Sequence, residues 1–324
     1  MLLVVITASL HADDGAASIA AGGIVVMKQE PRIVMAKEVL QISAKKVIVD
    51  YDFRNDSDAD ITTEVAFPIP GYSLAMEDIK PSAQGFDDFR LWIDGDPARY
   101  QVEARAFLKD AEYTELLRGM HVDVASFGHA TSNVETPDIR KLTANQRQQL
   151  EALALIDHED GSPLWMVKKT YHWQQAFPAR KTVHIRHEYS PVFGSENSVA
   201  YGLGSNPDQR AAKEIESFCL DGRLRDSLSE IANSKDRWAS YSYVDFILTT
   251  ANTWKTPIED FTLIVERPHW KNNQGEPDLA DYVSFCWDGP ITKIDGDHFS
   301  AHTGNLVPAK ELRVGFFSVE HGRH

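Results

Sequence analysis

The 324-residue chain is long enough for two domains, and its 43% hydrophobic and 25% charged residues exclude a largely disordered protein. Its 48 acidic residues outnumber its 33 basic ones, which gives a formal net charge of -15. Such a chain repels phosphate backbones and anionic membrane surfaces, so we expect neither nucleic acid nor a membrane surface as a partner.

The first twelve residues, MLLVVITASLHA, form a short apolar run that ends in small residues. This pattern is typical of a secretory signal, so we predict a signal-peptide remnant at residues 1–12 and a mature chain that starts at Asp13. A buried first strand is the alternative. No later run approaches the roughly 18 to 20 apolar residues that span a bilayer. We therefore expect no transmembrane segment and a periplasmic or secreted location.

Residues 13–109 carry the pattern of an N-terminal β-sandwich domain. The runs KKVIVDYDFRN at 45–55 and ITTEVAFPIP at 61–70 alternate along their length, which is typical of half-buried strands. Because Asn and Asp residues that favour turns separate the two runs, we predict that they form one antiparallel hairpin. A second hairpin is predicted at 89–107, around the turn residues Asp94 and Gly95.

Residues 110–160 predict a helical insertion. The runs DAEYTELLRGM at 110–120 and TANQRQQLEALALI at 143–156 have the pattern of helices. Thr143 and Gln146 fit a capping box, which satisfies the free amides at a helix start. Residues 122–138 lie between the two helices and have weak periodicity, so we predict a mobile loop there.

The strand pattern returns in residues 161–324, which we predict to be a C-terminal β-rich domain with short helices. Residues 163–177 and 181–193 have the pattern of two paired strands joined at Pro178, and 206–233 has that of a helical stretch. Four further strand candidates follow at 240–252, 258–267, 282–289 and 312–319. The predicted fold is mainly β, with two β-sandwich-like domains and a helical insertion between them.

The chain has two cysteines, Cys219 and Cys286. In an exported chain such a pair predicts one disulfide, whereas in a cytosolic chain two unrelated buried thiols are the alternative. A bridge that closes so long a loop would stabilise the fold by roughly 3 to 4.7 kcal/mol in the chain-entropy model. Zinc would need further ligands, and none flank these cysteines.

Several segments together resemble the bacterial domain of unknown function family 4424. They are AAGGIVV at 20–26, VDYDFRNDSDADITTEVAFPIP at 49–70, YHWQQAFPARKTVHIRHEY at 171–189, ILTTANTWKTPIEDFTLIVE at 247–266 and SFCWDG at 284–289. The resemblance implies an exported protein with a predominantly β fold, and it implies no activity.

A second similarity covers the N-terminal part only. FRNDSDAD, FPIP, LWIDGDP and EARAFLKDAEYTELLRG together resemble the VIT domain of inter-α-trypsin inhibitor heavy chains, a β-sandwich module often coupled to a von Willebrand A domain. The Asp-x-Ser-x-Ser metal pattern of that partner domain is missing, and the nearest string is DSLS at 226–229. The resemblance therefore does not carry over an adhesion function through a divalent ion.

Sequence patterns of catalysis, metal binding and cofactor binding do not occur in the chain. G-x-S-x-G, H-E-x-x-H, the P-loop and G-x-G-x-x-G are all absent, so we predict no catalytic residues, no metal and no cofactor. His172 and His184 could face each other across the hairpin predicted at 163–193. The run IDGDHF, with Asp295, Asp297 and His298, could bind calcium weakly, although an ordinary Asp/Gly turn is the better interpretation.

Aromatic residues near strand ends supply the candidate binding residues. Trp173, Trp254 and Trp270 lie near predicted strand ends or turns and could stack on sugar rings, with Asn252 in the loop before Trp254. Core packing is the commoner fate of aromatic side chains. We expect a non-enzymatic binding or assembly module whose partner is an envelope protein or a glycan. The alternatives are an envelope hydrolase acting on peptidoglycan or polysaccharide, which would need two carboxylates in one cleft, and a structural subunit of an oligomer.

Overall fold

The structure is a computed structural model that describes residues 13–20, 25–72, 88–124, 137–191, 193–271 and 277–321. The predicted signal remnant, 1–12, lies outside the described residues. The strands are β1 (Gly15–Ile19), β2 (Val25–Met27), β3 (Ile33–Ile42), β4 (Val47–Asn55), β5 (Ile61–Pro68), β6 (Arg90–Ile93), β7 (Asp96–Pro97), β8 (Gln101–Leu108), β9 (Ala111–Glu112), β10 (Met166–Phe177), β11 (Thr182–Tyr189), β12 (Phe193–Glu196), β13 (Arg237–Phe246), β14 (Ile258–Glu266), β15 (His269–Lys271), β16 (Pro277–Leu279), β17 (Tyr282–Phe285), β18 (Ile291–Lys293), β19 (His298–Leu306) and β20 (Leu312–His321). The helices are α1 (Thr114–Gly119), α2 (Pro137–Arg140), α3 (Ala144–Ala152), α4 (Ala200–Leu203), α5 (Gln209–Glu216), α6 (Gly222–Ala232) and the 3-10 helix η2 (Thr249–Thr253).

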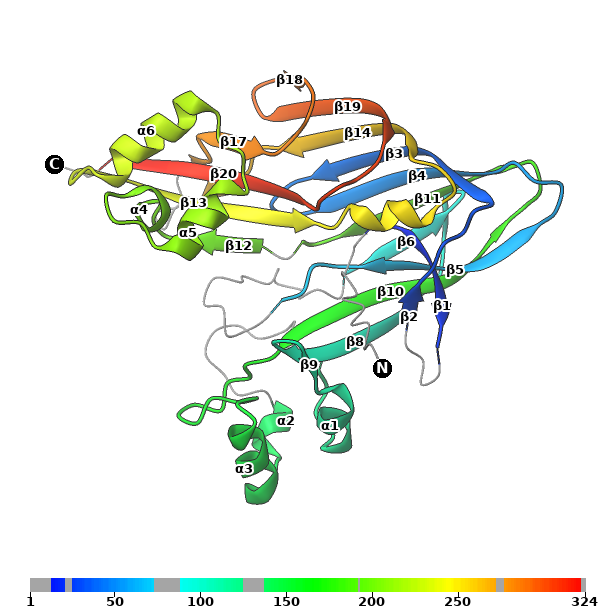
Figure 1. Ribbon diagram of the computed structural model, residues 1–324, viewed down its shortest axis with the longest axis horizontal. Helices are drawn as coiled ribbons and strands as arrows, with labels where there is room; N and C mark the ends of the chain where they lie inside the picture. Colours follow the sequence, from blue (N-terminus) through cyan, green and yellow to red (C-terminus); the bar gives the residue numbers. More distant parts are fainter. Residues whose placement is uncertain are drawn as a thin grey trace, which may run out of the picture.

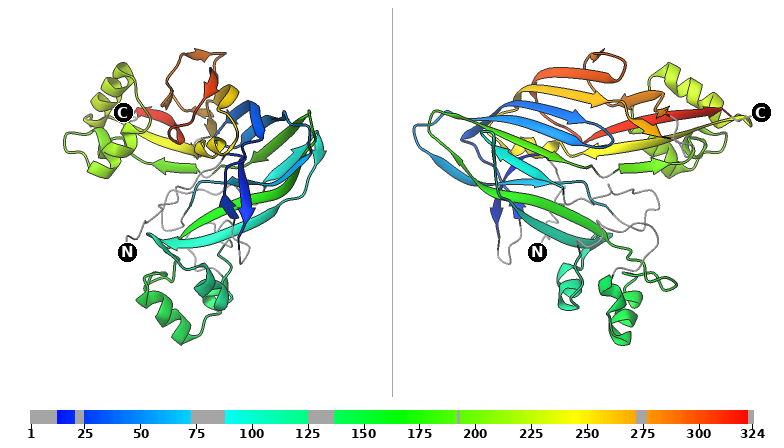
Figure 2. Two further views of the ribbon diagram at one scale, coloured as in Figure 1. Left: turned by 45° about the vertical axis from the view of Figure 1, so that its right-hand side comes forward. Right: turned by 180° about the vertical axis from the view of Figure 1, so that it is seen from behind.

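Two large sheets form a sandwich, as Figures 1 and 2 show. Sheet I has the strand order β2-β1-β5-β10-β8-β9, and sheet II has the order β18-β19-β14-β3-β4-β11-β6-β7. Within sheet II, β14 and β3 run parallel, whereas the neighbouring pairs are antiparallel. The fold is mainly β, as predicted. Both sheets draw strands from either side of residue 161, so the predicted domain boundary there does not separate one sheet from another.

The apolar core lies between sheets I and II and follows from the alternation in the sequence. In β4, every second residue is buried, from Val47 to Phe53, and the intervening residues are half-buried. β5 and β11 show a similar alternation over much of their length. Side chains on one face of a strand point the same way, so each strand contributes one apolar row to the core.

The predicted hairpin of β4 with β5 is wrong, and so is the predicted pairing of β10 with β11. β4 pairs with β3 and β11 in sheet II, and β5 pairs with β1 and β10 in sheet I. Each turn therefore carries the chain across the sandwich instead of back along the same sheet. The physical reason is that the two apolar rows of consecutive strands are buried against each other only when the strands lie in opposite sheets.

This arrangement separates two histidines that we expected to face each other. His172 lies on sheet I, where its Nδ1 is 2.7 Å from Glu64 Oε1. His184 lies on sheet II, where its Nδ1 is 3.0 Å from Asp52 Oδ1. The prediction that the two could meet is wrong, because their strands belong to different sheets.

Local predictions that rest on turn and cap chemistry are confirmed. The hairpin predicted at 89–107 is wrong in its second arm, because β8 pairs with β10 in sheet I. Its turn is confirmed, since β6 and the short β7 form a hairpin whose turn residues Asp94 and Gly95 have φ angles of 51° and 88°. Those positive values suit Gly and are tolerated by Asp. α3 begins at a capping box, in which the Thr143 side chain accepts from the Gln146 amide and the Gln146 side chain accepts from the Thr143 amide. α1, α2 and α3 lie in the segment 110–160 and sit together beyond one end of β8 (Figure 1).

A third sheet extends the molecule beyond the sandwich. Sheet III has the order β12-β13-β20-β17, and α4, α5 and α6 lie near its far end (Figure 1). Apolar side chains of these helices and of β13 and β20 form a second core: Val199, Ile215, Phe218, Leu224, Leu228, Ile231, Ala239, Tyr241 and Phe317. Within the described parts of the chain, no helix combines the length and apolar character needed to cross a bilayer.

Candidate functional site

The tryptophans predicted to be exposed platforms are buried where the structure describes them. Trp173 is 4% exposed and Trp254 is 3% exposed, so the expectation of exposure is wrong for both. Both belong to the sandwich core, where Trp173 packs edge-on to His187 and Trp254 packs against Phe53. Burying so large an apolar ring stabilises the fold more than its exposure to a ligand would.

The remaining predicted binding residues do not gather into a site. Asn252 is exposed, and its Nδ2 donates a hydrogen bond to the carbonyl of Pro308 at 2.8 Å. The side chain of Trp270 lies outside the described residues, as does most of the loop predicted to be mobile at 122–138. The described start of that loop, Val122 and Val124, is buried.

The predicted disulfide is present and joins two segments of the third-sheet region. Cys219 and Cys286 are bonded with a Cα–Cα distance of 4.9 Å. Cys219 lies between α5 and α6, and Cys286 directly follows β17. Ser284 Oγ donates to the Phe218 carbonyl at 2.9 Å beside the bridge. The bridge therefore ties the helices to the edge strand of sheet III.

A cleft of about 660 Å³ lies beside this bridge, and we call it the disulfide cleft. Its walls come from six separate segments of the chain. They are the end of β5 with the residues after it, the start of β10, the end of α5 with the residues up to Cys219, the end of β13, Cys286, and the start of β20 with the two residues before it. The lining residues are Pro68, Ile69, Pro70, Gly71, Met166, Lys168, Lys169, Thr170, Glu216, Ser217, Cys219, Asp245, Phe246, Ile247, Cys286, Lys310, Glu311, Leu312 and Arg313.

Two of the acidic residues that line the cleft are already engaged. The Asp245 carboxylate accepts two hydrogen bonds from the Arg313 guanidinium, one from Nε at 2.6 Å and one from Nη2 at 2.7 Å. Arg313 also lies over the Tyr243 ring, 4.5 Å from its centroid. Glu311 accepts from the amides of Leu248 and Thr249 at 2.7 and 3.2 Å, and thereby caps η2. The polar groups of Asp245, Arg313 and Glu311 are therefore used within the protein, and these side chains form fixed parts of the cleft wall.

Two exposed charged groups on the cleft wall make no ion pair, side-chain hydrogen bond or ring contact among the described residues. One is the ammonium of Lys310 and the other is the carboxylate of Glu216, and both are exposed. Apolar side chains, including Ile69, Phe246 and Leu312, form much of the remaining wall. The cleft thus offers one exposed charge of each sign beside an apolar surface. Lys168 adds a half-buried ammonium, which lies 4.2 Å from the centroid of the Phe107 ring.

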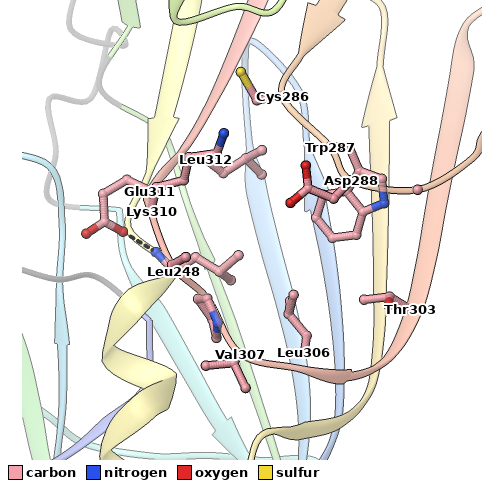
Figure 3. A pocket seen from close by; sticks show the side chains of 13 residues that line it. Leu248, Cys286, Trp287, Asp288, Thr303, Leu306, Val307, Lys310, Glu311 and Leu312 are labelled. Carbon is pink, nitrogen blue, oxygen red and sulfur yellow. Dashed lines mark hydrogen bonds between the residues drawn. The ribbon is translucent and has the colours of Figure 1, made fainter.

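A smaller cavity of about 140 Å³ adjoins the cleft and is drawn in Figure 3. It shares Cys286, Lys310, Glu311 and Leu312 with the cleft. The Trp287 ring lies on its wall and stacks on Phe261, with ring centroids 5.5 Å apart. The figure shows the bond from the Leu248 amide to Glu311 at the rim.

The described chain contains no group of three or more His, Cys, Asp or Glu side chains placed to hold a metal ion. At Asp295, the carboxylate Oδ1 accepts from the amides of Asp297 and His298, both at 2.8 Å. That is the geometry of an Asp turn, in which the side chain satisfies the backbone of its own loop.

Sequence patterns did not reveal the cleft, because its walls come from segments that lie far apart in the chain. The two cysteines were the one local signal that pointed to this region.

One comparison with known proteins identifies a family, and that family is named for lacking a known function. A family model described as "Domain of unknown function (DUF4424)" matches residues 12–314. Among solved structures, the chain is similar to a "putative nutrient binding protein" from Legionella pneumophila, with 14% identity, a TM-score of 0.45, and coverage of 94% of this chain and 70% of that one. No curated protein matches the chain.

Proposed function

The chain belongs to the DUF4424 family, and we propose that it is an exported binding protein that holds a small zwitterion in the disulfide cleft. A ligand of this class has an apolar body and one charge of each sign, as an amino acid or a short peptide has. The observation that carries the proposal is the cleft of about 660 Å³, with Lys310 and Glu216 left available on an apolar wall.

The size and position of the cleft support a binding role. Ligand sites in proteins are concave, measure roughly 300 to 1,000 Å³, and combine apolar walls with a few polar groups. They also occur preferentially where two structural units meet. The disulfide cleft has walls from both the sandwich and sheet III.

The charges of the cleft favour a ligand with both signs. Asp245 and Glu311 are engaged by Arg313 and by backbone amides, which leaves Glu216 to receive an ammonium group and Lys310 to receive a carboxylate. Hydrolysis by paired carboxylates needs two that are free to exchange protons with a substrate. The engagement of Asp245 and Glu311 therefore favours binding over catalysis.

Export is supported by the apolar N-terminal run and by the disulfide. Disulfides persist mainly in oxidising compartments and are rare in the cytosol. An extracytoplasmic location also suits a protein that collects small molecules for the cell.

The test is a titration of the oxidised protein with free amino acids and dipeptides, followed by calorimetry. The same compounds with an acetylated amine and an amidated carboxyl serve as matched ligands without charge. We expect at least one zwitterion to bind and its capped form to bind more weakly. Lys310→Glu should weaken binding by about tenfold, which corresponds to about 1.4 kcal/mol.

Lys45→Glu provides the matched control, because Lys45 is exposed in the turn between β3 and β4 and makes the same change of charge away from the cleft. We expect this variant to bind as the wild type does. Failure of every zwitterion to bind, or equal binding by Lys310→Glu and Lys45→Glu, would reject the proposal.

A further inference from the structure

Three acidic side chains are buried together inside the sandwich. Asp13, Asp14 and Glu38 are each 0% exposed. Asp13 and Asp14 directly precede β1, and Glu38 lies on β3. With His187 of β11, which is also 0% exposed, we call them the buried acid nest. Acidic residues are almost never fully buried unless they are paired, so the nest requires a physical explanation.

A β-bulge in β3 directs the side chain of Glu38 toward the buried acid nest. The pairing of β3 with β4 shifts between Met35 and Lys37, which leaves one extra residue on β3. Beyond the bulge, Glu38 and every second residue after it are buried, whereas Lys37 is exposed. Without the extra residue, Lys37 would point inward and Glu38 outward. Bulges often re-aim a side chain in this way beside functional sites.

The nest lacks a positive partner within the described chain. Asp13 Oδ1 accepts from Tyr51 Oη at 2.5 Å, but neither carboxylate oxygen of Asp14 has a hydrogen-bond partner among the described residues. The carboxyl of Glu38 lies beside that of Asp13 and has no donor from any other described residue. Neither ring nitrogen of His187 has a hydrogen-bond partner among these residues either, although its Nε2 lies 3.5 Å from Asp14 Oδ2. Burial lowers the pKa of His187 to about 3, so at neutral pH its ring is uncharged and does not offset the acids.

Burial also changes the pKa values of the carboxyl groups. Burial raises the pKa of Asp13 to about 8, and it raises the pKa values of Asp14 and Glu38 well above their usual range. Repulsion from Asp13 further raises the pKa of Asp14, and repulsion from Asp13 and Asp14 further raises the pKa of Glu38. A positive charge inside the nest would let the acids ionise and would form a compact, paired cluster.

The backbone at the start of the described chain is held at the nest by side chains of η2 and Trp254. Thr250 Oγ1 accepts from the Asp13 amide and donates to the Asp13 carbonyl at 2.6 Å. Trp254 Nε1 donates to the Asp14 carbonyl at 2.6 Å. A Cβ added to Gly15 would lie 2.0 Å from Met27 Cε and 3.1 Å from Thr250 Cβ, so the chain also lies too close here for a side chain.

We propose that Asp13 is the first residue of the mature protein and that its α-ammonium group supplies the positive charge of the buried acid nest. A peptidase would hydrolyse the bond between Ala12 and Asp13, using one water molecule. The carboxylate stays on the released leader, and the amine on Asp13 takes up a proton. The backbone nitrogen of Asp13 then carries three protons where the uncleaved amide carries one. This inference rests on the predicted leader and is independent of the ligand of the cleft.

Covalent geometry places the new charge close to the carboxyl of Asp13. The nitrogen of Asp13 is separated from its own carboxyl carbon by two carbon atoms, and that carboxyl interacts with both Tyr51 and Glu38. One ammonium proton can keep the bond to Thr250, and the other two are available to the carboxylate oxygens that lack partners. Cleavage thereby couples export to stability, because the leader-bearing chain must bury its acids without a counter-charge.

The test compares two oxidised proteins that differ only in their first residue. Each is released from a removable N-terminal carrier, so that one begins at Asp13 and the other retains Ala12. Unfolding by guanidinium at neutral pH gives the equilibrium constant for each. We expect the equilibrium constant for unfolding to be at least about tenfold larger for the chain that retains Ala12, which means that this chain is less stable. The reason is that removal of one partner from a buried charge cluster is strongly destabilising.

A second pair of proteins separates this mechanism from a simple effect of length. Glu38→Gln is made in both forms, and the difference between the two N-termini should shrink, because one carboxylate no longer needs the ammonium. Asp14→Asn serves the same purpose if Glu38→Gln does not fold. Equal stability of the two N-termini, failure of the Asp13 form to fold, or a difference that both substitutions leave unchanged would overturn the proposal.

Discussion

Replacement of both cysteines by alanine should remove a large part of the stability of the fold. Cys219 and Cys286 are 67 residues apart in the sequence. For a loop of that length, the chain-entropy model gives a loss of about 4.4 kcal/mol at 25 °C. Domains are typically stable by roughly 5 to 15 kcal/mol, so the change is large enough to measure without ambiguity.

Guanidinium unfolding, followed by far-ultraviolet circular dichroism, provides the assay. The double variant should unfold at a lower denaturant concentration than the oxidised wild type, and the wild type in reductant should match it. Each single variant, Cys219→Ala or Cys286→Ala, also lacks the bridge. We therefore expect each single variant to lose about as much stability as the double variant, since both changes remove the same bond.

Two outcomes would refute this reasoning. One is a loss well below 1 kcal/mol in the double variant, which would mean that the loop is already constrained in the unfolded chain. The other is a pair of single-variant losses that add up to the loss in the double variant, which would assign the effect to packing of the two side chains. None of these variants alters the partners of the bond from Ser284 Oγ to the Phe218 carbonyl.

Three further predictions concern single side chains. Asp245→Asn should lower the free energy of unfolding in urea by about 1 to 2 kcal/mol, because Arg313 loses its charged bidentate partner. An unchanged free energy of unfolding would contradict this prediction. Burial lowers the pKa of His187 to about 3 from an ordinary value of 6.5. Between these values the unfolded chain binds a proton at His187 that the folded chain does not, so the contribution of His187 to stability falls as the pH drops from 6.5 to 3. The raised pKa values of Asp13, Asp14 and Glu38 act in the opposite direction in both proteins, so the test is the difference between them. The stability of the wild type relative to His187→Phe should fall over this range, and a difference that does not change with pH would count against the reasoning. Trp254→Phe should lower the free energy of unfolding by about 1 to 3 kcal/mol, because the buried Asp14 carbonyl loses its hydrogen-bond donor. Trp238→Phe replaces a half-exposed ring and should change the free energy of unfolding little. Equal losses in the two variants would disprove the role given to the Trp254 hydrogen bond.

Local features of the fold could be predicted because their causes lie within a few neighbouring residues. The alternation in β4 identifies which face is buried, and Thr143 and Gln146 identify the start of α3. Asp94 and Gly95 identify a turn, since they accept positive φ angles. Two cysteines identify the disulfide when export is assumed.

Strand partners could not be predicted in the same way. β4 and β5 each present one apolar row, and that row faces the core whether the two strands are neighbours in one sheet or lie in facing sheets. The choice between a hairpin and a crossing of the sandwich depends on strands that come more than a hundred residues later, such as β10 and β11. Alternation contains no information about that choice.

The candidate sites were hidden for related reasons. The disulfide cleft is assembled from six distant segments, and none of them has a motif of its own. The buried acid nest depends on a bulge in β3 that reverses the direction of Glu38, and a strict alternation would place that residue outside. The predicted role of Trp254 failed because its ring fills the core next to Phe53.

The occupancy of the disulfide cleft is the most direct test of the proposed binding function. Native mass spectrometry of the protein, purified under oxidising conditions from its own cells, measures whether a small molecule remains bound. We predict a second peak displaced by the mass of a small zwitterion, which disappears when Lys310 is replaced by Glu and persists when Lys45 is replaced by Glu. A bare protein in all three preparations, or an adduct that survives both replacements, would contradict the account.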